Sequence, residues 1–218
     1  MKSIFSKENL KYIENFNDDI LSKLNNEFIK TLNNVDKTPR IIGDLTENFL
    51  RDIFYNNLPK NLGKFINRKF GRREMADFAF EDNYNNYIIV DVKTHTKYTE
   101  FNMPNITSVK RLADFYKNDQ NIFSLLIVTY DSIKNNFDNI YFIPIEYLNW
   151  SCLTLGALGN GQIQIANSNI INVDTNNTRK KWMLEFIDVV YNFYEHESEK
   201  IIERKKYFKE IRKYWESK

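Results

Sequence analysis

YIIVDVKT, residues 87–94, decides the fold, together with the ADFAF of residues 76–80 that precedes it. Both segments are rich in β-forming residues, and the EDNYNN between them has the composition of a turn. The two segments therefore predict a β-hairpin. Residues 87–90 are apolar without alternation, which is typical of a central strand that is covered on both faces.

Helices and strands alternate on both sides of this hairpin. Apolar residues three or four apart predict a helix over residues 6–34, and a second helix is predicted to begin after Gly43, with Asp44 as its N-cap, and to end at residues 56–59. Further along, the pattern predicts a helix over about residues 105–118, strands at 122–130, 140–145 and 162–165, and one or two long helices from residue 178 to about 217. We therefore expect an α/β fold in which a central mixed β-sheet is flanked by helices and followed by a long C-terminal helix.

The composition excludes several classes of protein. With 42% hydrophobic residues the chain can bury a core, and with 31 Lys+Arg against 29 Asp+Glu its net charge is only +2. A single cysteine, Cys152, excludes an intramolecular disulfide, and two histidines are too few for a Cys/His zinc site, so a metal would need oxygen ligands. No window approaches 18 uncharged apolar residues, and we expect a cytoplasmic protein without a membrane span.

The small net charge conceals two basic stretches. Residues 60–73 carry six Lys/Arg and no acid, and residues 200–218 carry eight Lys/Arg against three Glu. Both could follow the phosphates of a nucleic acid, although for the C-terminal stretch a solvated helix face is the stronger alternative. Most of the many asparagines are accounted for by an AT-rich genome.

Three side chains of the hairpin carry the candidate chemistry. Asp91 and Lys93 are two residues apart in one strand and so project from the same face, and Asp77 is expected beside them on the first strand. Two carboxylates suit Mg²⁺, which prefers oxygen ligands and keeps waters for a phosphate, and a neighbouring lysine can position or help deprotonate an attacking water. The alternative is an ordinary ion pair on the surface of a strand. The apolar strand that leads into Asp91 favours a buried site over that alternative.

The order of motifs resembles the PD-(D/E)xK nucleases, and among them the blunt-cutting EcoRV/HincII group of type II restriction endonucleases. The similarity is carried by DVKT at residues 91–94, PNITS at residues 104–108 and QIQI at residues 162–165, followed by Thr178 and Arg179 at the start of the last helix. Ala76 stands where the motif has proline, a common departure in the superfamily.

The resemblance implies a complete catalytic site. Its catalytic residues would be Asp77, Asp91, Lys93 and Glu47. Mg²⁺ would be coordinated by Asp77, Asp91 and the backbone carbonyl of Val92. For Glu47 an alternative stays open, because residues 44–47 have the spacing of a capping box, in which Glu47 returns a hydrogen bond to the helix start.

Sequence readout is expected from amide side chains, because Asn and Gln pair with adenine edges in the major groove. The resemblance selects the loop after the catalytic strand and the segment 160–177. The candidate DNA contacts are Thr94, Lys97, Asn102, Asn105, Gln162, Gln164, Asn167, Asn169, Asn176, Asn177 and Arg179. Asn105 could instead cap the following helix, Asn176 and Asn177 could be ordinary loop residues, and the two glutamines could face solvent.

The implied activity is Mg²⁺-dependent cleavage of double-stranded DNA at a short palindrome by a homodimer, with blunt ends and 5′-phosphates. A cognate DNA methyltransferase would protect the same site in the host. We expect one restriction-endonuclease-like domain over residues 1–218, with an N-terminal helix (1–36), a catalytic core (44–150), a recognition loop and strand (151–177) and C-terminal helices (178–218). Two other hypotheses stay open: a DNA repair or junction-resolving nuclease of the same fold, and a non-catalytic DNA-binding module.

Overall fold

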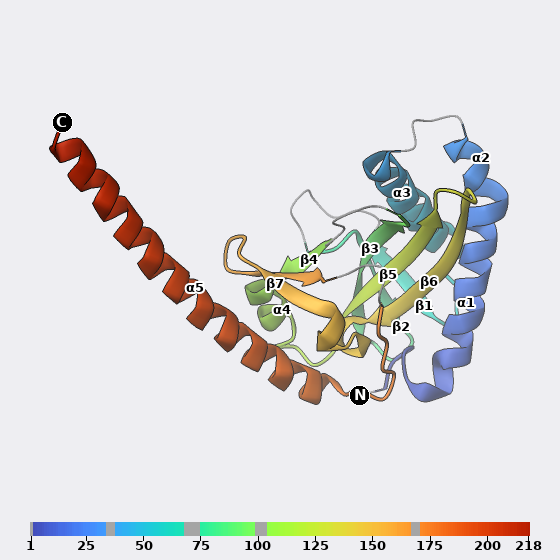
Figure 1. Cartoon of the computed structure of the whole chain (residues 1–218). Helices are drawn as coiled ribbons and strands as arrows, with labels where there is room; N and C mark the ends of the chain where they lie inside the picture. The colour runs from blue at the N-terminus through green and yellow to red at the C-terminus, as the bar shows by residue number, and fades with distance from the viewer. Residues whose placement is uncertain (1, 34–37, 68–74, 99–103, 167–170) are drawn as a thin grey trace.

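The computed structural model describes residues 2–33, 38–67, 75–98, 104–166 and 171–218. Within these ranges helices and strands combine in an α/β arrangement (Figure 1). The helices are α1 (Leu10–Lys23), α2 (Ile29–Leu32), α3 (Pro39–Asn57), α4 (Val109–Phe115) and α5 (Arg179–Glu216). A π-helical turn at Leu24–Phe28 joins α1 to α2, and 3-10 turns lie at Lys7–Asn9, Ile145–Tyr147 and Trp150–Cys152.

The strands form two sheets. The larger has the order β1-β2-β3-β5-β6 and the smaller the order β4-β8-β7. The strands of the larger sheet are β1 (Gly63–Asn67), β2 (Phe78–Asp82), β3 (Tyr87–Thr96), β5 (Asn121–Asp131) and β6 (Asn136–Pro144), and those of the smaller are β4 (Asn105–Ser108), β7 (Leu153–Gly156) and β8 (Gln162–Ile165). Only β3 and β5 pair in parallel, so the central sheet is mixed, as expected.

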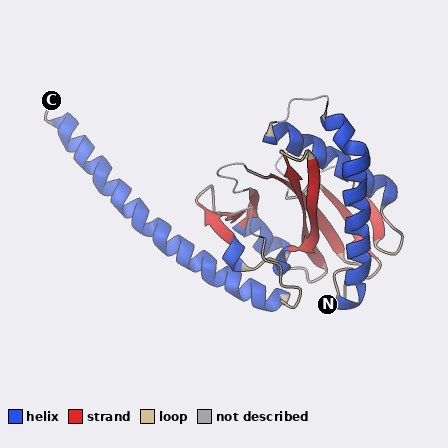
Figure 2. Cartoon of the chain, turned by 45° about the vertical axis from the view of Figure 1, so that its right-hand side comes forward, coloured by secondary structure: helices blue, strands red, loops and turns tan. Residues whose placement is uncertain are grey.

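The central strand β3 contributes to hydrophobic clusters on both faces of the larger sheet. Ile88, Val90 and Val92 pack into the cluster formed with α1 and α3, whereas Ile89 packs into the cluster formed with α4, α5 and the smaller sheet. Figure 2 shows α1 along one side of the strands and the smaller sheet with α5 on the other. The prediction of a strand covered on both faces is therefore confirmed.

The start of α3 differs from the prediction. The helix begins at Pro39 with Thr38 as N-cap, whose hydroxyl accepts a hydrogen bond from the Ile41 N–H at 3.4 Å. Thr-Pro is itself a helix-start signal, because threonine caps the backbone and proline suits the first helical position. Asp44 lies inside the helix, so its expected capping role is wrong, and the capping-box interpretation of Glu47 is wrong with it.

The segment that begins at Asn105 also differs from the prediction. Asn105 begins strand β4 rather than a helix, and the helix that follows, α4, is capped by Ser108, whose hydroxyl accepts from the Arg111 N–H at 3.3 Å. The β-branched Ile106 and Thr107 favour a strand there, and β8 provides a partner for it. The interpretation of Asn105 as a helix cap is therefore wrong.

The C-terminal segment forms one continuous helix, α5. Its buried residues are Trp182 and Phe186, which pack against the body, and Cys152 lies buried in the same cluster. Among the described residues no helix combines the length with the apolar character that a membrane crossing requires.

Candidate functional site

The hairpin of β2 and β3 holds Asp77 and Asp91 side by side. The Asp77 N–H donates to the Val90 carbonyl at 2.9 Å, and the Asp77 Oδ2 accepts from the Val92 N–H at 2.6 Å. Because the ladder pairs Phe78 with Val90, Asp77 stands opposite Asp91. The expected juxtaposition across the hairpin is confirmed.

Asp91 has one paired and one unpaired carboxylate oxygen. Its Oδ1 accepts from the Lys93 Nζ at 2.8 Å, whereas its Oδ2 is buried and has no hydrogen-bond partner among the described residues. The side chain is deeply buried, since Asp91 is only 5% exposed. A buried carboxylate oxygen without a partner is costly, and a proton or a cation would relieve the cost.

Burial raises the pKa of the Asp91 carboxyl from 3.8 to about 7. The ammonium of Lys93 opposes this rise, whereas the negative charges of Asp77 and Glu47 add to it. Burial likewise raises the pKa of Asp77, against the hydrogen bond from Val92 and the charges of Lys93 and Arg51. The two aspartates therefore hold protons to a higher pH than ordinary carboxyls.

Lys93 is held in its charged form. Burial lowers the pKa of its amine, but the charges of Asp91, Asp77 and Glu47 and the hydrogen bond to Asp91 together raise that pKa above its ordinary value. An ammonium therefore lies among three acids at neutral pH. It can donate hydrogen bonds to a phosphate or to a water, and the acids around it keep its proton in place.

Glu47 reaches the same cluster from α3. Burial raises the pKa of its carboxyl, with Asp77 adding to the rise and Arg51 and Lys93 opposing it. Its carboxylate forms an ion pair with Arg51, one helical turn further along, and the Arg51 Nη1 also donates to the Asn48 Oδ1 at 2.9 Å. The structure thus brings all four predicted catalytic side chains into one electrostatic cluster.

The donor set of this cluster fits a hard divalent cation. Among the described residues no three acidic, histidine or cysteine side chains already converge as ligands. Asp91 nevertheless offers a buried oxygen without a partner, and Asp77 stands beside it. The amide of Val92 points at Asp77, and a strand directs the carbonyl of a residue toward the same neighbour as its amide. These are the oxygen ligands that Mg²⁺ prefers.

The smaller sheet presents two of the predicted DNA contacts together. Asn105 of β4 is exposed, and its Oδ1 accepts from the Nε2 of Gln164 on β8 at 2.7 Å. Gly156 of β7 makes room for this glutamine, because a Cβ there would lie 2.6 Å from the Gln164 Oε1. Gln162 lies on the same face, and its buried Oε1 has no hydrogen-bond partner among the residues that the structure describes. The amides of Asn105 and Gln164 therefore orient each other.

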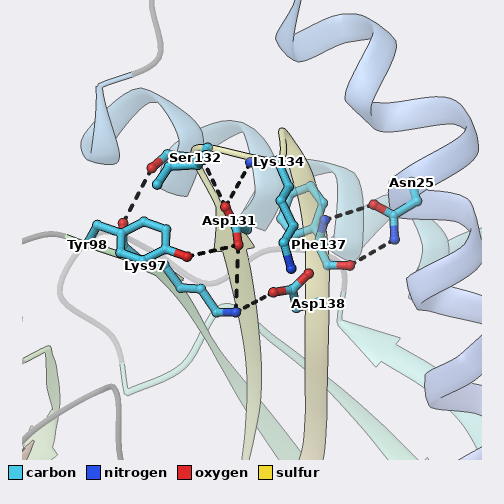
Figure 3. A network of polar contacts seen from close by, with 9 residues as sticks. Asn25, Lys97, Tyr98, Asp131, Ser132, Lys134, Phe137 and Asp138 are labelled. Atoms are coloured by element: carbon cyan, nitrogen blue, oxygen red, sulfur yellow. Dashed lines mark hydrogen bonds and ion pairs between the residues drawn. The ribbon is translucent and has the colours of Figure 1, made fainter.

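Thr94 follows Lys93 on β3, and Lys97 comes directly after the end of the strand. The Thr94 Oγ1 is buried and finds no hydrogen-bond partner within the part of the chain that the structure describes. Lys97 forms an ion pair with Asp138 and lies 3.8 Å from the Asp131 Oδ2, within the polar network of Figure 3. Asp131 also accepts from the Tyr98 hydroxyl at 3.3 Å. These contacts fix Lys97 on the sheet without a nucleic acid.

Asn176, Asn177 and Arg179 connect the start of α5 to the rest of the chain. The Asn176 Oδ1 accepts from the Lys7 Nζ at 2.7 Å, and the Asn177 Nδ2 donates to the Glu146 carbonyl at 3.0 Å. Arg179 donates to the Glu146 Oε1 at 3.0 Å and to the Asp119 carbonyl at 2.9 Å, and its guanidinium lies 4.4 Å from the centre of the Tyr116 ring. All three residues therefore have structural partners within the fold.

Three predicted DNA contacts lie outside the described residues: Asn102, Asn167 and Asn169. The basic stretch 60–73 is described only as far as residue 67.

Comparison with known proteins adds nothing to the site. The chain matches no model of a protein family and no curated protein. A function therefore has to be inferred from the geometry of the acid–lysine cluster and from the resemblance carried by its motifs.

Two residues of the site were missed by sequence reasoning. Arg51 neutralises Glu47, and its spacing of four residues on a predicted helix is the signal that could have identified it. Gly156 on β7 makes room for Gln164 on β8. Because the two residues lie on different strands, no local sequence pattern predicts this contact.

Proposed function

We propose that the chain is a Mg²⁺-dependent type II restriction endonuclease with a restriction-endonuclease-like fold, acting as a homodimer on a short palindrome. The proposal rests above all on Asp77, Asp91 and Lys93, which meet on one β-hairpin with a buried Asp91 oxygen that has no partner. Support also comes from the order of the DVKT, PNITS and QIQI motifs. Blunt cutting, 5′-phosphate ends and a cognate methyltransferase follow from the resemblance.

In the proposed reaction Asp77, Asp91 and the Val92 carbonyl would hold Mg²⁺, which polarises a phosphate and activates a water when bound. The Lys93 ammonium would donate hydrogen bonds to that water or to a phosphate oxygen, stabilising the negative charge that develops on phosphorus. Glu47, held by Arg51, places a negative charge next to Lys93. This charge helps to keep the Lys93 Nζ protonated. Asn105 and Gln164 would present their amides to base edges.

A digestion experiment tests the activity. The purified chain is incubated with a sequenced plasmid and Mg²⁺, and the ends of the products are mapped. We expect discrete fragments from the wild type. Lys93→Ala and Asp91→Ala should bind the same DNA while cleaving it at least about 10³-fold more slowly, because transition-state stabilisation is lost. Lys23→Ala, which removes a half-buried α1 lysine paired with Asp19, is the matched control and should cut normally.

Other results of the digestion experiment would contradict the active-site assignment or favour one of the two other hypotheses. Normal cutting by Lys93→Ala or Asp91→Ala would contradict the active-site assignment. Nicking that depends on DNA structure would favour a repair or junction-resolving nuclease. Tight metal-free binding without products would favour a DNA-binding module. As a readout that is independent of cutting, Mg²⁺ should raise the melting temperature of the wild type and not that of Asp91→Ala.

A further inference from the structure

The C-terminal half of α5 projects away from the body of the protein, as Figures 1 and 2 both show. Every residue from 198 to 218 is exposed. This projecting segment, which we call the arm, nevertheless carries large apolar side chains, among them Ile201, Phe208 and Trp215, which are 48%, 66% and 68% exposed. A helix that presents so much apolar surface to water usually has a partner.

Seven of the exposed apolar residues of α5 lie on one stripe that runs along the helix, whereas Ile202, Tyr207, Ile211 and Tyr214 are exposed outside it. Ten positions alternate at spacings of three and four residues: Leu184, Ile187, Tyr191, Tyr194, Ser198, Ile201, Lys205, Phe208, Arg212 and Trp215. Seven of them are large and apolar, and these seven are 43% to 68% exposed. The stripe lies apart from Trp182 and Phe186, which pack on the body and are 0% and 2% exposed, and one stripe residue, Tyr194, donates a hydrogen bond to the Asn160 carbonyl at 2.6 Å. A seven-residue repeat of this length is the pattern of a coiled coil.

After the three basic residues at its start, Arg179, Lys180 and Lys181, the charges on α5 are separated along the helix. Residues 183–199 carry five acids and no Lys or Arg, whereas residues 200–218 carry eight Lys/Arg and three Glu. Two parallel copies would set the acidic half against the acidic half, and would set Lys205 and Arg212 against their own copies. Two antiparallel copies would set the acidic half against the basic half, which is the favourable arrangement.

We propose that α5 pairs with α5 of a second copy of this chain in an antiparallel coiled coil, with the two-fold axis between Glu199 and Lys200. In this register every position of the stripe meets another: Leu184 meets the partner's Trp215, Tyr191 meets the partner's Phe208, and Ser198 meets the partner's Ile201. The boundary between acidic and basic halves coincides with the axis. This pairing does not depend on the proposed nuclease activity.

The flanks of the seam provide a second set of complementary contacts. The register places the partner's Lys209 between Asp188 and Glu195, all three of which are exposed in the single chain. Lys209 is 14 residues beyond Glu195 and 21 beyond Asp188, or about 21 Å and 32 Å along one helix. Lys209 can therefore form an ion pair with Asp188 or Glu195 only if they belong to two different copies of the chain.

Sedimentation equilibrium of the full chain tests the pairing. We expect a dimer for the wild type and a dissociation constant at least about 100-fold larger for Phe208→Glu, because a charge replaces an apolar residue in the seam. Lys209→Glu should weaken the dimer about 10-fold, and Asp188→Lys combined with Glu195→Lys should restore the dimer of Lys209→Glu. Lys206→Glu, with the same charge change on the outer face of the helix, is the matched control and should dimerise normally. A monomeric wild type, or a Phe208→Glu variant that dimerises like the wild type, would overturn the proposal.

Disulfide crosslinking tests whether the two α5 helices run antiparallel. When Tyr191→Cys and Phe208→Cys variants are mixed and oxidised, a disulfide should join one variant to the other, while each variant alone stays largely uncrosslinked. Parallel helices would give the reverse, with each variant crosslinking to itself. The native Cys152 is 3% exposed and does not compete. Crosslinking of each variant with itself would refute the antiparallel arrangement.

Discussion

At the scale of single residues, Asp91 makes the most specific prediction about pH. Burial raises its folded-state pKa from 3.8 to about 7, so between these values the folded chain holds a proton that the unfolded chain has released. Stability therefore falls as the pH rises through this window. Without divalent cations the free energy of unfolding should drop between pH 5 and pH 8 by on the order of 2 kcal/mol from this residue, taking roughly 1.4 kcal/mol per pH unit. Urea unfolding at both pH values measures it.

Asp91→Asn isolates this contribution, because asparagine cannot bind the proton while Asp77 and Glu47 remain near Lys93. The drop in stability between pH 5 and pH 8 should become shallower in this variant. Asp18→Asn, at an exposed position of α1, is the control and should keep the wild-type profile. A profile unchanged by Asp91→Asn would mean that Asp91 is already ionised at pH 5.

The sequence predicts the arrangement of Asp77, Asp91 and Lys93 on the hairpin of β2 and β3 well, and the surroundings of these residues poorly. The period of two in a strand is enough to place Asp91 and Lys93 on one face, and a hairpin is enough to bring Asp77 across from them. The approach of Glu47 to Asp77 and Lys93 depends on where α3 begins and on how the helix packs against β3, which are tertiary facts. The sequence therefore left the role of Glu47 open.

At the scale of elements, the start of α3 makes a prediction about Gly43. Gly43 lies inside the helix, and a Cβ built on it meets nothing within 4 Å. Gly43→Ala should therefore raise the free energy of unfolding by about 0.5–1 kcal/mol, because alanine loses less backbone entropy on folding and fits the helix better. Urea unfolding measures the gain. In Gly156→Ala the added methyl group would instead displace the amide of Gln164, which should weaken its hydrogen bond to Asn105. A loss of stability in Gly43→Ala would argue that the helix begins after residue 43.

The elements that the sequence predicted wrongly share a physical cause. Glycine inside α3 and asparagine at the start of β4 both have weak local preferences, so the pattern favours a boundary at each. In the structure the Thr38 cap extends α3 past the glycine, and pairing with β8 makes a strand of the asparagine segment. The long apolar strands β3 and β5 carried stronger signals, and the sequence predicted their existence correctly.

At the scale of the whole molecule, α5 has two faces with different partners. Two residues near the start of the helix, one on each face, allow the two roles to be tested separately. Trp182 is 0% exposed and its Nε1 donates to the Leu148 carbonyl at 2.9 Å, whereas Leu184 is 55% exposed and lies on the proposed seam. Trp182→Ala should cost about 3–5 kcal/mol of unfolding free energy at any protein concentration, because it empties a buried aromatic site.

Leu184→Ala should behave differently, because its partner in the proposed coiled coil is the Trp215 of another molecule. It should destabilise the chain at concentrations where copies pair, and this effect should vanish on dilution, since mass action removes the partner. Thermal unfolding followed over a wide range of protein concentration distinguishes the two variants. If the effect of Leu184→Ala persists unchanged at the lowest concentration, Leu184 acts within its own chain, and the seam does not extend to the beginning of the helix.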